Sequence, residues 1–236
     1  MCGRLNVVDN PALIELIEGL GIALGPSQLR TGRFKRATDR ISIIRNKDGT
    51  RRLDDAIWWL LLEPAEQGFK PSKYTSFNTR YDKLNKPGSA GFTAFRQSRC
   101  VIPVMGFGES EFINKKPVHY HDFIAEQGAL LMGGIYREWM NKATGEITLS
   151  CSVITVPPHP KLRPYHAKSS PLIMPQDSAL LNAWLNENEH NTAQFEVLLE
   201  PHIPNNLRVF QIDKPSLHNV IKDKELVAAD PSCSAD

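Results

Sequence analysis

Cys2 carries the most distinctive chemistry of the sequence, because removal of the initiator methionine would leave it at the N-terminus. An N-terminal cysteine combines a thiol with an α-amine whose pKa is about 8, so a useful fraction of the amine is neutral at physiological pH. The two groups can attack one aldehyde carbon, the amine forming an imine and the thiol then closing a five-membered thiazolidine ring. A cysteine in second position can also be accidental, so other residues have to support this interpretation.

Three further segments contain side chains that suit such chemistry. Asn78 and Arg80 lie in SFNTRYD, Glu109 ends RCVIPVMGFGE, and His166 lies in HPKLRPYHAKSSPLIMP. Each has an ordinary explanation when it is taken alone: a strand-edge amide, a surface arginine, a solvated carboxylate, a histidine packed beside prolines. Their order along the chain, behind an opening MCGR, gives them weight.

The ordered set resembles the SOS-response-associated peptidase family, whose domain recognises abasic sites in single-stranded DNA. The likeness runs along most of the chain and rests on five segments. They are MCGR, ISIIRNKDGTRRLDDAIWWLLL, SFNTRYD, SRCVIPVMGFGE and HAKSSPLIMP. The resemblance implies a covalent thiazolidine crosslink between the protein and an abasic site, with no cofactor and no metal. It also implies that the protein removes its own leading methionine, as a peptidase.

The resemblance assigns roles to four candidate catalytic residues. Cys2 would form the covalent link, and Asn78 would hold the sugar by hydrogen bonds. Glu109 would transfer protons, and His166 would assist imine formation, ring opening or crosslink reversal.

Three further residues are expected to contact the DNA. Arg4 and Arg80 would bind phosphates next to the lesion, and Trp59 would stack on an unpaired base. The chain departs from the family pattern at three places. Ser110 follows Glu109 where the family usually has tryptophan, Trp58-Trp59 replaces tryptophan-glycine, and RATDR replaces an alanine-proline-threonine element.

The arrangement of apolar runs predicts one α+β domain over residues 1–236, with a mixed, mostly antiparallel, barrel-like sheet and flanking helices. Asn10-Pro11 opens a predicted short helix, and residues 41–62 form a predicted hairpin around KDGT. Four strand-like runs follow between residues 99 and 156, then two predicted helices in 177–201 and a late strand at 207–212. Residues after about 222 are expected to form a flexible tail.

Composition sets the broad class of protein. The chain has 236 residues, 41% hydrophobic and 23% charged, with no apolar run long enough to span a bilayer. The N-terminus lacks the pattern of a secretory signal, so we expect a cytoplasmic monomer with reduced thiols. Nine basic residues lie between Arg30 and Arg52. They are either part of a polyanion-binding surface or a solvated face.

Two other functions are compatible with parts of the pattern. Glutamine amidotransferases with an N-terminal cysteine also begin Met-Cys-Gly, although their asparagine-glycine and arginine motifs are not found in this sequence. A non-catalytic single-strand-binding protein would use the basic stretch and the aromatic residues, and would not need Cys2. A metal enzyme is disfavoured, because His119 and His121 have no third ligand at suitable spacing.

Overall fold

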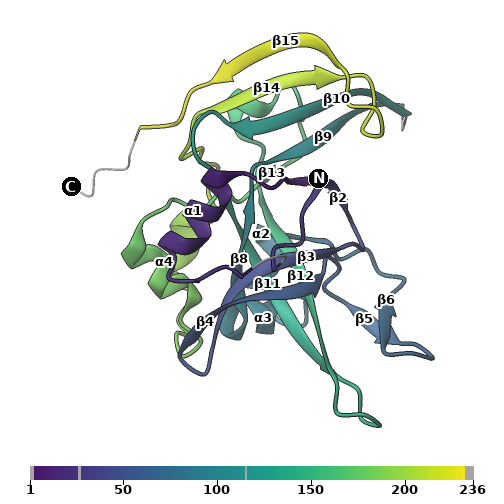
Figure 1. Cartoon of the computed structure of the whole chain (residues 1–236), viewed down its shortest axis with the longest axis vertical. Coiled ribbons are helices and arrows are strands. Elements are labelled where there is room, and N and C mark those ends of the chain that lie inside the picture. Colours follow the sequence, from purple (N-terminus) through teal and green to yellow (C-terminus); the bar gives the residue numbers. More distant parts are fainter. Residues whose placement is uncertain (1–2, 26–27, 115, 232–236) are drawn as a thin grey trace.

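The computed structural model describes residues 3–25, 28–114 and 116–231. It shows a single α+β domain built from two large sheets, with short helices around them (Figure 1). This confirms the predicted fold class. Cys2 lies outside the described residues, as does Cys233.

Among the described residues, five strands close into a barrel. They are β3 (Arg40–Lys47), β4 (Thr50–Ile57), β8 (Arg99–Val104), β11 (Leu130–Met140) and β12 (Ile147–Val156). The order β11-β8-β3-β4-β12 is closed by the pairing of β12 with β11. Two short strands, β7 (Asn78–Arg80) and β13 (Ser170–Pro171), also pair with β12, beyond its pairing with β11. The C-terminal end of β12 therefore brings together β7 and β13, two segments that are far apart in the sequence.

The second large sheet is antiparallel throughout and lies above the barrel in Figure 1. Its strands, in order, are β15 (Val220–Val227), β14 (Leu207–Ile212), β10 (Lys116–Ala125), β9 (Gly106–Ile113), β1 (Arg4–Val7) and β2 (Gly32–Arg36). Strand β9 follows β8 with only Met105 between them. The chain thus passes directly from the barrel into the second sheet. Buried apolar residues of both sheets form one hydrophobic core.

The helices are short and lie around the sheets (Figure 1). They are α1 (Pro11–Gly19), α2 (Tyr81–Leu84), α3 (Phe92–Gln97) and α4 (Ser178–Leu185), with 3-10 helices η1 (Pro160–Leu162) and η2 (Ala193–Leu199). A small hairpin contains β5 (Leu62–Pro64) and β6 (Phe69–Pro71). Helix α1 begins as predicted, because the Asn10 side chain accepts a hydrogen bond from the Ala12 amide and Pro11 takes the first helical position.

The chain end is a correction to the sequence analysis. Residues after about 222 were expected to form a flexible tail, but Val220–Val227 is strand β15, paired with β14. Only Val227 of this strand is buried, so β15 lacks the apolar alternation that identifies a strand in a sequence. The segment 192–201, predicted as a helix, contains the 3-10 helix η2 instead.

Candidate functional site

The first described residues lead directly into the candidate site. Gly3 precedes β1, and Arg4 lies opposite Gly108 of β9. Glu109 is the next residue of β9, so its side chain lies on the opposite face of the sheet from Arg4. The site therefore has two parts, one around Glu109 on one face of this sheet and one around Arg4 on the other.

Glu109 is a buried carboxylate, with 2% of its surface exposed. Burial disfavours the charged form and raises the pKa of Glu109 to about 7. A carboxyl group with this pKa is present in both protonation states near neutral pH. It can therefore accept a proton in one step and return it in another.

The segment 157–169 carries His166 to Glu109. This segment leaves β12 at Val156, and the chain returns at Ser170, which pairs with Val156. The Ser170 hydroxyl also accepts a hydrogen bond from the His159 amide, at 3.0 Å. The segment is thus tied at its base, and the His166 amide donates to the Leu162 carbonyl within it.

His166 is held in one orientation by β9. Its Nδ1 lies 3.3 Å from the Ser110 carbonyl oxygen, which can only accept a hydrogen bond, so Nδ1 carries the proton. The same nitrogen lies 3.6 Å from Glu109 Oε2. Burial lowers the pKa of His166 to about 4, so the ring is neutral near pH 7 and its contact with Glu109 is not an ion pair. This tautomer leaves Nε2 as a proton acceptor.

Glu109 and His166 thus have pKa values shifted in opposite directions from their ordinary ones. The carboxyl group holds a proton to higher pH than usual, and the imidazole stays neutral to lower pH. Pairs of titratable groups in this condition are typical of acid–base sites.

His121 was considered in the sequence analysis only as a metal ligand, without a third ligand at suitable spacing. It lies opposite Glu109 on β10, so the two side chains are on the same face. His121 is buried, and burial lowers its pKa. His119 is exposed and contacts Glu111 at 2.7 Å. No sequence signal distinguishes the two histidines, because only the pairing of β9 with β10 places one beside Glu109.

Arg4 lies on the other face, in a buried network that links three parts of the chain. Its guanidinium donates to the Ser110 hydroxyl at 3.0 Å and lies 3.5 Å from the Asp122 carboxylate. Asp122 is fully buried and contacts His218 Nε2 at 2.6 Å. Gly108 makes room for this arrangement, since a Cβ there would lie 2.5 Å from Arg4 Nε and 2.8 Å from Asp122 Oδ1.

Removal of the Asp122 carboxylate is expected to destabilise the whole domain. Asp122→Ala would remove the buried carboxylate that faces the Arg4 cation and His218, and breaking a buried pair in this way typically costs about 3–5 kcal/mol of unfolding free energy. Denaturant titration measures this loss. Glu63→Ala is the matched control, because Glu63 pairs with Lys70 on the exposed surface at 3.4 Å, where a pair is worth about 1 kcal/mol or less. Equal losses in the two variants would contradict the importance of the Arg4–Asp122 contact.

Strand β7 places Asn78 and Arg80 at the same end of the barrel as the segment that carries His166. Asn78 lies beside Val153, and Arg80 beside Thr155, in a parallel pairing with β12. Strand β12 ends one residue later, at Val156, where that segment begins. Arg80 is largely exposed, with its guanidinium 3.0 Å from Asp82, whereas Asn78 is half-buried.

Trp59 lies near β7, because its ring contacts Phe77, the residue that precedes this strand. The Trp59 ring is half-buried and tilted against Phe77, with 5.8 Å between ring centroids. Trp58 is fully buried and donates its indole N–H to the Phe77 carbonyl at 2.8 Å. Both tryptophans thus contact Phe77, the residue before Asn78.

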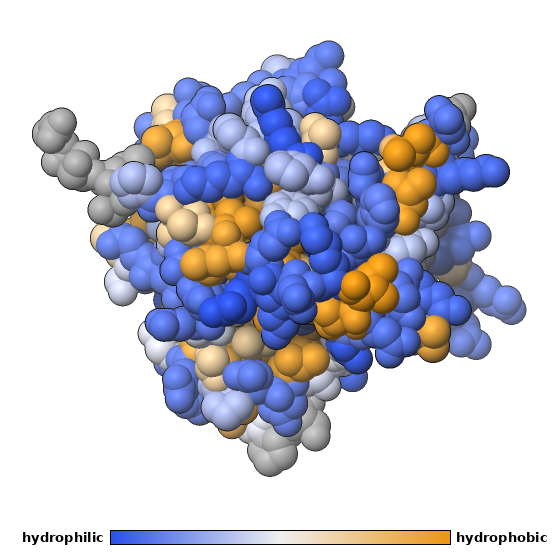
Figure 2. Space-filling view, turned by 90° about the horizontal axis from the view of Figure 1, so that it is seen from above, coloured by the Kyte–Doolittle hydropathy of each residue, from blue (hydrophilic) through white to orange (hydrophobic). Residues whose placement is uncertain are grey.

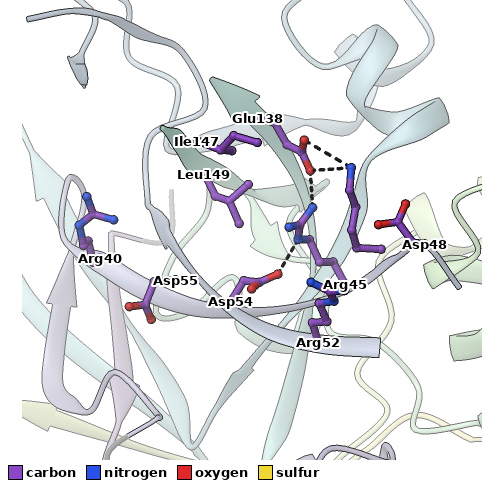
Figure 3. A pocket seen from close by; sticks show the side chains of 10 residues that line it. Arg40, Arg45, Asp48, Arg52, Asp54, Asp55, Glu138, Ile147 and Leu149 are labelled. Carbon is purple, nitrogen blue, oxygen red and sulfur yellow. Dashed lines mark hydrogen bonds and ion pairs between the residues drawn. The ribbon is translucent and has the colours of Figure 1, made fainter. Parts of the chain in front are cut away.

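Part of the basic stretch from Arg30 to Arg52 is balanced by carboxylates, since Arg30, Arg45 and Lys47 form ion pairs within the described part of the chain. One pocket on this stretch has a volume of about 390 Å³. In it Arg45 contacts Asp54 at 2.7 Å and Glu138 at 2.5 Å, and Figure 3 marks both contacts by dashed lines. Outside that group, Arg30 contacts Asp55 at 2.6 Å. The pocket is lined by four basic residues (Arg40, Arg45, Lys47 and Arg52) and four acidic ones (Asp48, Asp54, Asp55 and Glu138). This balance favours a solvated face rather than a polyanion-binding surface for the part of the stretch that lines this pocket.

Within the described part of the chain, no group of three or more histidine, cysteine, aspartate or glutamate side chains could hold a metal ion. None of the helices described is long and apolar enough to cross a membrane.

One family model covers most of the chain in comparisons with known proteins. The family model of the SOS response associated peptidase (SRAP) matches residues 1–216. A curated relative, abasic site processing protein YobE of Bacillus subtilis, is 23% identical over 170 residues, which are 70% of this chain and 73% of that protein.

Solved structures share the fold. A protein from Bacteroides thetaiotaomicron has a TM-score of 0.70 at 19% identity, covering 92% of this chain and 95% of that one. A protein from Bordetella bronchiseptica has a TM-score of 0.69 at 17% identity, covering 90% and 100%. The family match favours the first interpretation of MCGR over a glutamine amidotransferase. The chain belongs to the SOS response associated peptidase (SRAP) family.

Proposed function

We propose that this protein recognises abasic sites in single-stranded DNA and links to them covalently through Cys2, after removal of Met1. The observation that carries the proposal is the Glu109–His166 pair, with its 3.6 Å contact and oppositely shifted pKa values, beside the strand that continues from Cys2. The name of the relative YobE, an abasic site processing protein, supports the substrate.

The proposed reaction has two stages. The α-amine of Cys2 adds to the aldehyde carbon of the ring-opened abasic sugar, and loss of one water gives an imine. The thiol then adds to the imine carbon: a carbon–sulfur bond forms, and the thiol proton moves to nitrogen. The product is a thiazolidine ring that joins protein and DNA, and no oxidant or reductant is needed.

Glu109 and His166 supply the proton transfers in this proposal. The Glu109 carboxylate takes a proton from the Cys2 ammonium, and the acid form returns it when hydroxide leaves the intermediate as water. The Nε2 lone pair of His166 accepts a proton during addition of the thiol. Asn78 holds the sugar by hydrogen bonds, and Trp59 stacks on a base. A peptidase step in which the protein removes its own Met1 belongs to the same proposal.

A denaturing gel tests the proposed function. The protein is incubated with a single-stranded oligonucleotide that carries one abasic site, and with the same oligonucleotide after borohydride reduction of its aldehyde to an alcohol. We expect a slowly migrating band with the first and none with the second, because the alcohol cannot form an imine. Fully paired abasic DNA should give less product. A band of equal strength with reduced DNA, or none with either, overturns the proposal.

Arg80 is expected to contribute to non-covalent affinity, because its exposed guanidinium can contact a phosphate. Arg80→Ala should weaken binding to single-stranded DNA at every sequence, and the slope of log affinity against log salt should fall by about one unit or slightly less. Arg208→Ala is the matched control, since Arg208 is also exposed and also bound to one carboxylate, Glu126. Fluorescence anisotropy at several salt concentrations measures both. Identical slopes in the two variants would contradict the assignment.

The surroundings of Arg4 favour a structural role for this residue. Its guanidinium is buried and bound to Ser110 and Asp122, so we propose that it organises β1 against β9. Contact of Arg4 with a phosphate stays a prediction from the resemblance.

A further inference from the structure

A small pocket opens beside His166, on the surface of the β9–β10 hairpin. Its volume is about 150 Å³, and it lies between the end of β9 and the segment that carries His166. We call it the Phe112 pocket and define it by Phe112, Arg163, His166 and Lys168, which line it. Figure 2, which views the molecule from above, shows that face as mostly hydrophilic, with apolar side chains in separate patches.

Phe112 is an exposed aromatic ring at the wall of this pocket. Half of the residue is exposed, at 50%. The Lys168 ammonium lies 5.8 Å from the ring centroid, within the range of a cation–π contact. This contact favours one orientation of a ring that belongs to a half-exposed residue. An exposed, oriented ring can stack on a nucleic acid base of any sequence.

The charges around Phe112 favour an anionic ligand. Arg163 and Lys168 are both exposed, and neither forms an ion pair with a carboxylate of the described residues. Glu111 is the acidic residue of the pocket lining, and its carboxylate is bound to His119 at 2.7 Å. The pocket lining thus has two cations against one carboxylate, with the exposed Phe112 ring beside them, a combination that suits a nucleotide, with its base on the ring and its phosphate near the cations.

His166 connects this pocket to the proposed chemistry. It lines the Phe112 pocket and also contacts Glu109 Oε2, so one side chain borders both places. We propose that the Phe112 pocket binds the nucleotide next to the abasic site, with its base stacked on Phe112 and its phosphate held by Lys168 and Arg163. This proposal rests on the proposed function and adds to it a binding site for an intact neighbour of the lesion.

Binding of a non-reactive ligand tests the pocket separately from the covalent step. The probe is a single-stranded oligonucleotide with a reduced abasic site, made in two forms. One has ordinary bases on both sides of the lesion, and the other lacks the base on both sides. Phe112→Ala should weaken binding of the first form about five- to hundredfold, the range expected for loss of one base–aromatic stack. It should leave binding of the second form unchanged.

Matched variants complete the experiment. Phe112→Trp should restore affinity for the first oligonucleotide. Ile113→Ala removes a neighbouring side chain of similar exposure, 54%, and should have no effect. Lys168→Ala should weaken both forms, because both contain the phosphate. The proposal is overturned if Phe112→Ala matches the parent protein on both forms, or weakens both equally.

The outcome is distinguishable from failure of the proposed function. Phe112→Ala retains Cys2, so at saturating protein it should still form the covalent product with the aldehyde-bearing oligonucleotide. If the parent protein gives no covalent product, the proposed function fails, whatever the binding data show. If the parent forms the product while Phe112→Ala binds normally, only the pocket assignment fails.

Discussion

Cys2→Ala protein is expected to form no covalent product with abasic single-stranded DNA at any incubation time. The variant keeps an α-amine, which can form an imine, but an imine without a neighbouring thiol is hydrolysed under the denaturing conditions of the gel. The expected change is therefore from a stable product to none. Borohydride added during incubation should trap the imine of Cys2→Ala, and this second measurement separates loss of the thiol from loss of binding.

The other cysteines provide controls for this result. Cys100 and Cys151 are fully buried, and burial raises the pKa of both thiols far above the ordinary range. A buried neutral thiol is a poor nucleophile. Cys151→Ala should consequently form the covalent product in the same yield as the parent protein. A stable product that survives Cys2→Ala without borohydride would refute the role of Cys2.

Glu109→Gln is expected to slow covalent product formation by about 10²–10⁴-fold, the usual contribution of one general acid–base group. The rate in the parent protein should rise with pH through about 7, because the carboxylate is the proton acceptor and the pKa of Glu109 is about 7. Glu109→Gln should lose this step and keep a rise near pH 8 from the α-amine.

His166→Ala separates the two proton-transfer roles. It should also slow the reaction, but the pKa of His166 is about 4, so the variant should retain the step near pH 7. Single-turnover time courses between pH 5.5 and 9 measure these profiles. If both variants keep the parent rate and profile, Glu109 and His166 are structural.

Glu109→Gln, which should slow the reaction, is expected to raise the stability of the protein at neutral pH. As pH rises from 4.5 to about 7, the unfolded chain releases the Glu109 proton before the native protein does. The native state therefore loses stability over this window, by about 1.4 kcal/mol per pH unit and roughly 3 kcal/mol in total. Glu109→Gln has no such loss. Its unfolding free energy should exceed that of the parent at pH 8 by more than at pH 5.

Local sequence signals predicted much of the barrel. The hairpin of β3 and β4 is an example: Asp48 and Gly49 both have positive φ, 53° and 73°, as the favoured two-residue hairpin turn requires. Asp-Gly between apolar runs predicts this turn from four neighbouring residues. Strand β2 and strand β15 were missed, because their charged residues give no apolar alternation and their pairing with distant strands determines their structure.

The candidate site was predictable only in part. The resemblance selected Glu109 and His166, and the structure brings them together. Their pKa values depend on burial by segments far apart in the chain, so no local pattern could predict them. The Arg4–Asp122–His218 network was not predicted, because Arg4 and Asp122 are 118 residues apart and Asp122 and His218 are 96 apart. Such contacts follow from strand register, which the sequence alone does not reveal.

The position of β1 between β2 and β9 has a consequence for synthesis on the ribosome. Arg4 and Glu109 are 105 residues apart, so at about 5–20 residues per second β9 emerges roughly 5–20 s after β1. During that time one edge of β1 has no partner, and Leu5, which is fully buried in the finished protein, is exposed to solvent. His166 follows still later, and His218 later again. A nascent chain thus carries its first residues for several seconds before Glu109 and His166 have been synthesised, so the proposed removal of Met1 by the protein itself and the reactivity of Cys2 both have to wait until these later segments have folded.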